Sequence, residues 1–235
     1  MEKIAVAATG KNIQNAHKSV IEKIQQMIID GTLTVGDRLP PERELTEQLG
    51  VGRPALREAL KALEILGLIE SRHGSGNYVV NHVQESSFKP LSISFLLNNG
   101  SPSDVLDMRY CLECFAVRIA AEKADEKDIH HLNSLMDNMK AADNAADKAA
   151  ADRDFHFEIV KISDNLLFRN TLESISFLMD NFIEHSLQLS YFGQDSVENV
   201  YREHLAIINA ISSHNADAAE TAMKKHLSRI DIDRL

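Results

Sequence analysis

The sequence is poor in cysteine and has no long apolar run. Only Cys111 and Cys114 stand among its 235 residues, too few for a disulfide framework and typical of a reducing compartment. No apolar segment approaches the roughly 20 residues that a membrane-spanning helix requires. Residues 1–12 contain a short apolar patch but lack the length and basic charge of a secretory signal. The sequence therefore predicts a cytoplasmic protein with no membrane partner.

Proline and glycine are also scarce, with 5 and 10 residues. Ten of these fifteen residues lie between positions 31 and 76, where they mark turns. Hydrophobic residues make up 44% and charged residues 26% of the chain, as in folded globular proteins. The length suits one large domain or two of ordinary size.

Acidic residues outnumber basic ones, but only in one part of the chain. The total of 25 Lys and Arg against 35 Asp and Glu gives a formal net charge of −10. Residues 1–82 hold ten of each, so residues 83–235 carry the entire deficit. The first part can therefore approach a polyanion without the repulsion that the second part would add. Whether residues 1–82 bind a polyanion depends on how their basic residues are grouped.

The first eighty residues predict a helix-turn-helix. Residues 17–30 form an amphipathic helix by their apolar spacing. The segment PERELTEQLG (41–50) predicts a helix that ends at its glycine, and RPALREALKALEILG (53–67) predicts another with proline in its first turn. Only two residues separate these two helices, a connection typical of the helix-turn-helix.

A β-hairpin is predicted directly after these helices. Residues 68–71 and 77–80 have strand character, and RHGSG (72–76) supplies the glycines of the connecting turn. A helix-turn-helix followed by such a hairpin is a winged helix. In this arrangement the second helix of the motif enters the major groove of DNA.

Three basic residues stand four positions apart on the predicted recognition helix. Arg53 and Arg57 lie in its first turns, where they can reach guanine edges or phosphates, while Lys61 lies two turns in and suits a phosphate. The alternative is a solvated helix face on which Glu58 and Glu64 are local partners. The turn and the glycine-containing wing favour DNA binding. The candidate contacts are Arg43, Arg53, Arg57, Lys61, His73 and Gly74.

Residues 36–79 closely resemble the winged-helix domain of GntR-type bacterial transcription regulators. The likeness covers the Leu-Pro-x-Glu-Arg-Glu-Leu entry, the Arg-x-x-x-Arg-Glu-Ala-Leu helix and the His-Gly-x-Gly wing. It implies sequence-specific binding to double-stranded operator DNA by a homodimer. Gly52 and Ala55 stand where many relatives have serine or threonine, so hydroxyl contacts to phosphate are missing. The positions that match typical operator contacts are Arg43, Arg53, Arg57 and His73.

The rest of the chain predicts an all-helical domain. Residues 83–90 are polar and include a proline, so we expect a linker between a domain at 1–82 and another at 91–235. The fold class is thus mainly α, with a winged helix-turn-helix and an antiparallel helical bundle. Helices are predicted at 91–99, 101–124, 125–141, 146–162, 165–191, 195–213 and 216–231.

Four residues in the helical part have a spacing that suits a metal ion. Asp152 and His156 lie one turn apart on one predicted helix, and His204 and His226 adjoin the apolar faces of two others. Three imidazoles and a carboxylate suit Zn²⁺ or another first-row divalent ion. The alternative is that these are ordinary core or surface histidines, since the chain has ten.

This helical part resembles the FCD ligand-binding domain of the FadR subfamily through DMRYCLECFAVRIAA, DRDFHFEIV, REHLAIINAI and AMKKHL. The resemblance implies a divalent metal, Zn²⁺ with Ni²⁺ or Mn²⁺ as alternatives, held by Asp152, His156, His204 and His226. It also implies a small carboxylate effector at the metal, with Arg109 as its second partner, since a guanidinium fork suits a carboxylate. The alternative for Arg109 is an ion pair with Glu113 one turn on.

The predicted function is a ligand-responsive, DNA-binding transcription regulator, with repression favoured. Within the family, the DNA-binding part resembles regulators of lactate, pyruvate or glycolate metabolism, followed by sugar-acid regulators. Three alternatives remain open: a metal-dependent enzyme fused to a DNA-binding domain, an architectural DNA binder with a structural metal, and a regulator that responds to acyl-CoA. The enzyme alternative lacks an evident general base, since Glu158 lies two residues from His156 and points elsewhere on the helix.

Overall fold

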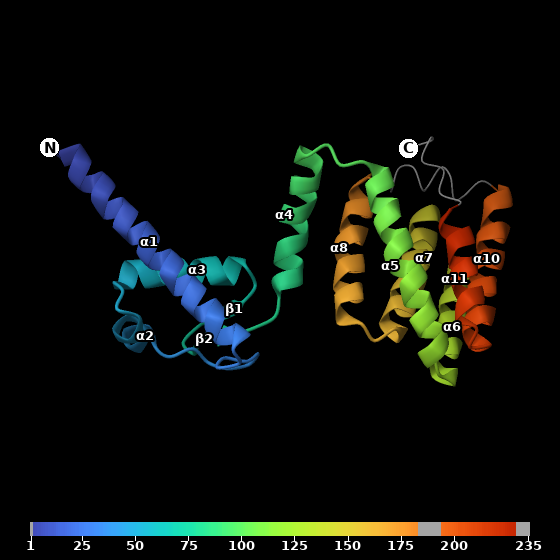
Figure 1. Ribbon diagram of the computed structural model, residues 1–235, viewed down its shortest axis with the longest axis horizontal. Helices are drawn as coiled ribbons and strands as arrows, with labels where there is room; N and C mark the ends of the chain where they lie inside the picture. The colour runs from blue at the N-terminus through green and yellow to red at the C-terminus, as the bar shows by residue number, and fades with distance from the viewer. Residues whose placement is uncertain (1, 183–193, 229–235) are drawn as a thin grey trace. The chain divides into compact units, whose positions relative to one another are not determined.

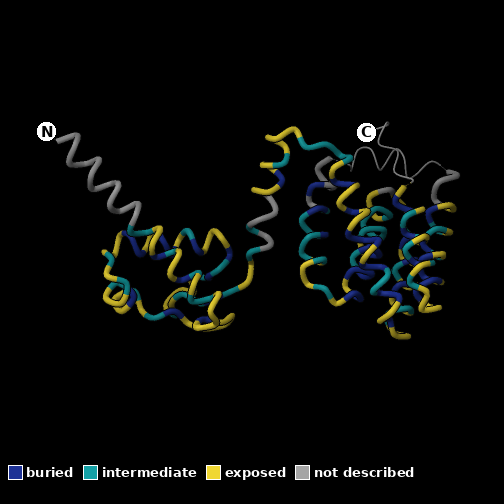
Figure 2. The backbone as a smooth tube through the Cα atoms, in the orientation of Figure 1, coloured by how far each residue is buried: buried dark blue, intermediate teal, exposed yellow. Residues whose placement is uncertain are grey.

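The computed structural model describes residues 2–182 and 194–228. The chain divides into two compact units, Met1–Pro90 and Leu91–Leu235. Both consist mainly of helices, with one two-stranded sheet in the first unit (Figure 1). Buried residues line the inner faces of the helices in each unit (Figure 2). The predicted class, mainly α with a winged helix-turn-helix and a helical bundle, is confirmed.

The first unit has the order of elements that the sequence predicts. Helix α3 packs against α1, α2 and the first strand, so it is the centre of the unit. The strands pair antiparallel from Ile69 opposite Val79 to Arg72 opposite Gly76. The elements are α1 (Glu2–Ile29), α2 (Glu42–Leu49), α3 (Arg53–Ile65), β1 (Ile69–Arg72) and β2 (Gly76–Val79).

A tight turn and an apolar core fix the angle between α2 and α3. Gly50 ends α2 with a left-handed backbone conformation, φ 64° and ψ 31°, which glycine adopts without steric cost. Leu56 and Leu63 of α3 are fully buried and belong to one cluster with Val20 and Ile24 of α1. This cluster holds the polar face of α3 toward solvent.

The segment 83–90, predicted as a linker, is helical and ends at the boundary between the two units. Helix α4 spans Val83–Leu97, and Pro90 lies inside it at the boundary between the units. Each half is anchored to its own unit: the hydroxyl of Ser86 donates to the Leu66 carbonyl at 2.8 Å, and Phe95 packs beside a cluster of the second unit. Pro90 removes one backbone hydrogen bond but does not end the helix.

The second unit is a bundle in which helix α5 is central, contacting four other helices (Figure 1). Ser101 and Asp104 form a capping box at the start of α5, and Asp125 and Asp128 form another at α6. Of the predicted helix at 165–191, residues 183–191 lie outside the described residues. The elements are α5 (Pro102–Lys123), α6 (Glu126–Ala141), α7 (Ala145–Ile162), α8 (Leu166–Phe182), α10 (Gln194–Ser212) and α11 (Ala216–Leu227).

Candidate functional site

The cations of the recognition helix are exposed on α3. Arg53 is the first residue of the helix, and Arg57 and Lys61 follow at intervals of one turn. Arg57 Nε lies 3.0 Å from a carboxylate oxygen of Glu42 on α2, and Lys61 Nζ lies 3.3 Å from Glu58. Exposed pairs of this kind are worth only about 0–1 kcal/mol. These side chains can therefore leave their partners for an anion at little cost.

The wing presents further basic groups. His73 and Gly74 lie exposed in the turn between β1 and β2, and Gly74 has φ +70°. The Arg72 guanidinium lies 4.4 Å from the ring centroid of Tyr78 on the opposite strand. Arg38, which was not among the contacts predicted from the sequence, forms a β-bridge with Tyr78 and lies beside Gly76. Arg38 and Tyr78 are far apart in the sequence, so the spacing of residues along the chain does not predict this contact.

Arg43 lies exposed on α2. Its side chain is 83% exposed on α2, with Nε 3.4 Å from a carboxylate oxygen of Glu47 one turn on. At the start of α3, the N-cap residue is Gly52, which has no side chain that could accept a hydrogen bond from the helix. The first backbone N–H groups of α3 therefore have no side-chain acceptor from the cap residue, and such groups can bind an anion.

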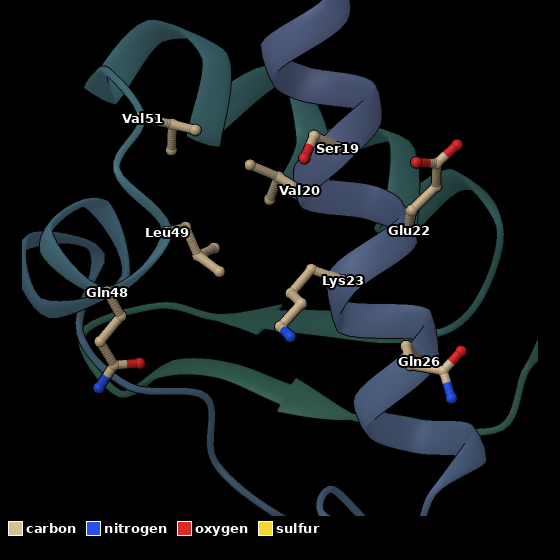
Figure 3. A pocket seen from close by; sticks show the side chains of 8 residues that line it. All are labelled: Ser19, Val20, Glu22, Lys23, Gln26, Gln48, Leu49 and Val51. Atoms are coloured by element: carbon tan, nitrogen blue, oxygen red, sulfur yellow. The ribbon is translucent and has the colours of Figure 1, made fainter.

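A hollow of about 390 Å³ lies on the first unit between α1 and the turn that precedes α3 (Figure 3). Lys23 extends into it from α1, and Leu49 and Val51 face it from the other side (Figure 3). Apart from Glu22 and Lys23 its lining is uncharged. It contains none of the residues that the sequence selected for DNA, metal or effector binding.

The four predicted metal ligands converge inside the second unit. Asp152 and His156 lie on α7, His204 on α10 and His226 on α11, and one ligand atom from each lies within 4.8 Å of the others. The Nε2 atoms of His156 and His226 are 3.1 Å apart. His204 Nε2 lies 3.2 Å from an oxygen of Asp152.

This cluster has buried polar atoms that the protein does not satisfy. His204 and His226 are fully buried, and His156 is 2% exposed. Asp152 Oδ1 and both ring nitrogens of His204 make no hydrogen bond. A buried polar group without a partner costs about 1–3 kcal/mol. The donor set and its unsatisfied atoms both fit a bound divalent cation.

The protonation states of the cluster also suit a metal. Burial alone would raise the pKa of Asp152, but His204, His156 and His226 hold it below its ordinary value. Burial lowers the pKa of His226 to about 4 and also lowers the pKa of His204, against the opposing effect of Asp152. At neutral pH Asp152 is therefore ionised and these two rings are neutral, as metal binding requires.

Two carboxylates behind the cluster were not selected from the sequence. Glu113 on α5 is buried between Arg109 and His156, contacting Nε of the arginine and Nδ1 of the histidine. Burial alone would raise the pKa of Glu113, but Arg109 and His156 lower it to about 2. Glu203 Oε2 lies 3.3 Å from His226 Nδ1. The contacts Glu113–His156 and Glu203–His226 each join two different helices. Glu113 and Arg109 lie one turn apart on the same helix, α5.

Arg109 and Glu158 both form ion pairs with charged side chains on their own helices. Arg109 is buried, and the ion pair with Glu113 that was its alternative interpretation is present. Glu158 directs its carboxylate to Lys161 at 3.0 Å and lies 3.6 Å from His131. It is therefore engaged away from the cluster.

Two family matches decide where the chain belongs. Residues 16–79 match the bacterial regulatory proteins of the gntR family, and residues 104–229 match the FCD domain. The chain belongs to the GntR family. The HTH-type transcriptional regulator LutR of Bacillus subtilis (strain 168) is 31% identical to this GntR-family chain over 207 residues, which are 87% of the chain and 94% of LutR. The predicted likeness to GntR regulators of the FadR type is confirmed.

Other relatives agree with this assignment. The Glc operon transcriptional activator of Escherichia coli (strain K12) is 33% identical over 219 residues, 90% of this chain and 85% of the activator. The solved structure of Streptococcus agalactiae GntR shares 26% identity and a TM-score of 0.64, over 91% of this chain and 98% of that one. LutR and the Glc operon activator both carry the name of a transcription regulator. Among the described residues, no helix combines the length and apolar character needed to cross a bilayer.

Proposed function

We propose that this protein is a homodimeric, cytoplasmic repressor that releases its operator DNA when a small carboxylate binds near a metal in the FCD domain. The observation that carries the proposal is the buried cluster of three imidazoles and a carboxylate with unsatisfied polar atoms. The GntR-type helix-turn-helix supplies the output, and the FCD domain supplies the sensor. The names of relatives support an organic acid as the signal, since one is a putative regulator of an L-lactate dehydrogenase operon in E. coli.

The proposed contacts to DNA lie on the exposed faces of α2, α3 and the wing. Arg53 and Arg57 at the start of α3 reach base edges or phosphates, and Arg43, Lys61, His73 and Gly74 contact the backbone or the adjacent groove. In a dimer, two such helices must match half-sites about 34 Å apart. A shift of a few ångströms between the two copies therefore weakens binding.

The proposed sensor holds a divalent ion, with Zn²⁺ favoured over Ni²⁺ and Mn²⁺, through Asp152, His156, His204 and His226. When bound, the ion supplies a Lewis-acidic site for a carboxylate oxygen. Arg109 contributes a positive charge from α5. We expect the helices of the FCD domain to have two arrangements in equilibrium. An effector shifts this equilibrium only if it binds one arrangement more tightly than the other.

Titration with candidate acids tests the proposal. L-lactate, pyruvate, glycolate and a sugar acid are each added to the metal-loaded protein on a DNA fragment selected by the wild-type protein. We expect one of these acids to weaken DNA binding at least about tenfold, corresponding to a coupling of about 1.4 kcal/mol. A strong chelator abolishes this response but leaves DNA binding by the metal-free protein. If every acid leaves the affinity unchanged, the proposed sensor is wrong.

Serine at position 52 is expected to tighten DNA binding. Gly52 has φ −74° and ψ 150°, and an added Cβ would meet only Pro54 Cδ at 3.7 Å. The serine hydroxyl can cap α3 in the free protein and donate to a phosphate in the complex. One net hydrogen bond of about 0.5–1.5 kcal/mol corresponds to a gain of about 2–10-fold in affinity. Fluorescence anisotropy with labelled operator measures it, with Gly52→Ala as the control; equal affinities for the two variants would contradict the expectation.

A further inference from the structure

A buried carboxylate lies behind the proposed metal centre and connects it to Arg109. Glu113 uses its two oxygens for two different residues: Oε1 accepts from Nε of Arg109, and Oε2 contacts Nδ1 of His156. We propose that Glu113 is a positioning residue that fixes the ring of His156 for metal binding and couples the metal centre to Arg109. The inference rests on the proposed function, because it assigns a role toward the same metal.

The contact with Glu113 determines which nitrogen of His156 carries the proton. A neutral imidazole has one N–H, and its hydrogen-bond partner selects the tautomer. Glu113 is paired with a guanidinium and acts as an acceptor, so the proton of His156 is placed on Nδ1. Nε2 then presents its lone pair toward His226, whose Nε2 is 3.1 Å away. Carboxylate partners of metal-binding histidines work in this way, and losing one costs about 10–100-fold in metal affinity.

Glutamine cannot replace Glu113, because it has one acceptor for two donors. If its amide oxygen accepts from Arg109, its NH₂ group faces His156 Nδ1 and moves the ring proton to Nε2, where it blocks the metal-facing lone pair. If the amide is turned the other way, its NH₂ group meets the N–H of Arg109. The side chain of Glu113 is 1% exposed, so water has little access with which to relieve either conflict.

Glu203 offers a matched control for this substitution. Its Oε2 lies 3.3 Å from Nδ1 of His226, and its side chain is 16% exposed. An amide oxygen can take over this contact with Nδ1 of His226. Glu203→Gln therefore removes the same charge from the outer side of the cluster while it permits the same histidine tautomer.

Zn²⁺ affinity measured by competition with a chromophoric chelator tests the role of Glu113. Glu113→Gln is expected to bind Zn²⁺ about 10–100-fold more weakly than the wild-type protein, and Glu203→Gln is expected to show a smaller loss. In the double variant Arg109→Met/Glu113→Gln the amide oxygen is released to accept from His156, so the affinity should partly recover. This recovery depends on the link to Arg109, and a merely structural role of Glu113 would not produce it. The double variant also keeps the test valid if Glu113→Gln alone fails to fold.

Histidine tautomers give a second readout that needs no metal. In long-range ¹H–¹⁵N spectra of metal-free protein with labelled histidine, His156 should be protonated on Nδ1 in the wild type and shift toward Nε2 in Glu113→Gln. Equal Zn²⁺ affinities together with an unchanged tautomer would overturn the role of Glu113 alone. Failure of the wild-type protein to bind Zn²⁺ would overturn the proposed metal centre, and this inference with it.

Discussion

Replacing Arg53 and Arg57 together by alanine is expected to weaken operator binding by about 10²–10⁴-fold, since each good bidentate contact is worth about 1–3 kcal/mol. Both residues are exposed at the start of α3 and aligned along one face. The ion pair between Arg57 and Glu42, with side chains 65% and 38% exposed, opposes DNA binding by no more than about 1 kcal/mol. Fluorescence anisotropy with labelled operator at fixed salt measures the loss.

A control of equal charge separates specific contact from bulk electrostatics. Lys161→Ala/Arg202→Ala also removes two positive charges, from residues of the helical unit that pair with Glu158 at 3.0 Å and Glu198 at 3.4 Å. This variant should keep nearly all operator affinity. Operator affinity that is equal in both double variants would mean that α3 is not the reading helix.

The salt dependence of the same variant distinguishes base contacts from phosphate contacts. If Arg53 and Arg57 each neutralise a phosphate, the slope of log affinity against log salt falls in magnitude by about 1.8 in the double variant. If they contact bases, the slope changes less and discrimination against mutated operators is lost instead. Each single variant then identifies the base position that its arginine reads.

The winged helix was predictable because its signals are local. Gly50 ends α2 with the left-handed backbone that its sequence position indicated. The apolar spacing of α3 placed Leu56 and Leu63 in the core and left the cations outside. The helical form of the segment 83–90 was not predicted, because Pro90 suits an irregular connection and a proline-containing helix equally well. Tertiary anchoring of Ser86 and Phe95 decides between them.

The cluster was predictable only in its ligand set. The one-turn spacing of Asp152 and His156 indicates a shared face, and His204 and His226 were selected because they adjoin the apolar faces of their helices. The resemblance to FCD domains then matched all four positions. The carboxylates behind the rings carry no such signal, because Glu113 is 43 positions from His156. From the sequence, Glu113 is one turn from Arg109, a spacing equally typical of exposed helix pairs. Packing of α5 against α7 turns this pair inward.

Leucine at position 204 is expected to abolish Zn²⁺ binding without a comparable loss of metal-free stability. His204 is fully buried with neither ring nitrogen hydrogen-bonded. The buried ring loses its hydration without gaining a hydrogen bond, and an apolar side chain of similar size avoids that cost. Asp152, 3.2 Å from His204 Nε2, keeps His156 as a neighbour at 3.8 Å. In contrast, Zn²⁺ at a thousand times its dissociation constant stabilises the wild-type protein by about 4 kcal/mol. For a protein of this size, that corresponds to a rise in Tm of about 8–16 °C.

Thermal unfolding with and without Zn²⁺ measures both halves of this expectation. The wild-type protein should gain the full rise in Tm, and His204→Leu should gain none while its chelated form melts near the chelated wild type. His130→Ala, which changes an exposed histidine outside the cluster, is the control and should respond like the wild type. If His204→Leu were stabilised by Zn²⁺ as strongly as the wild type, the ion would be bound elsewhere. A buried histidine that lowers metal-free stability and recovers it only with Zn²⁺ bound makes part of the free energy of unfolding depend on the ion.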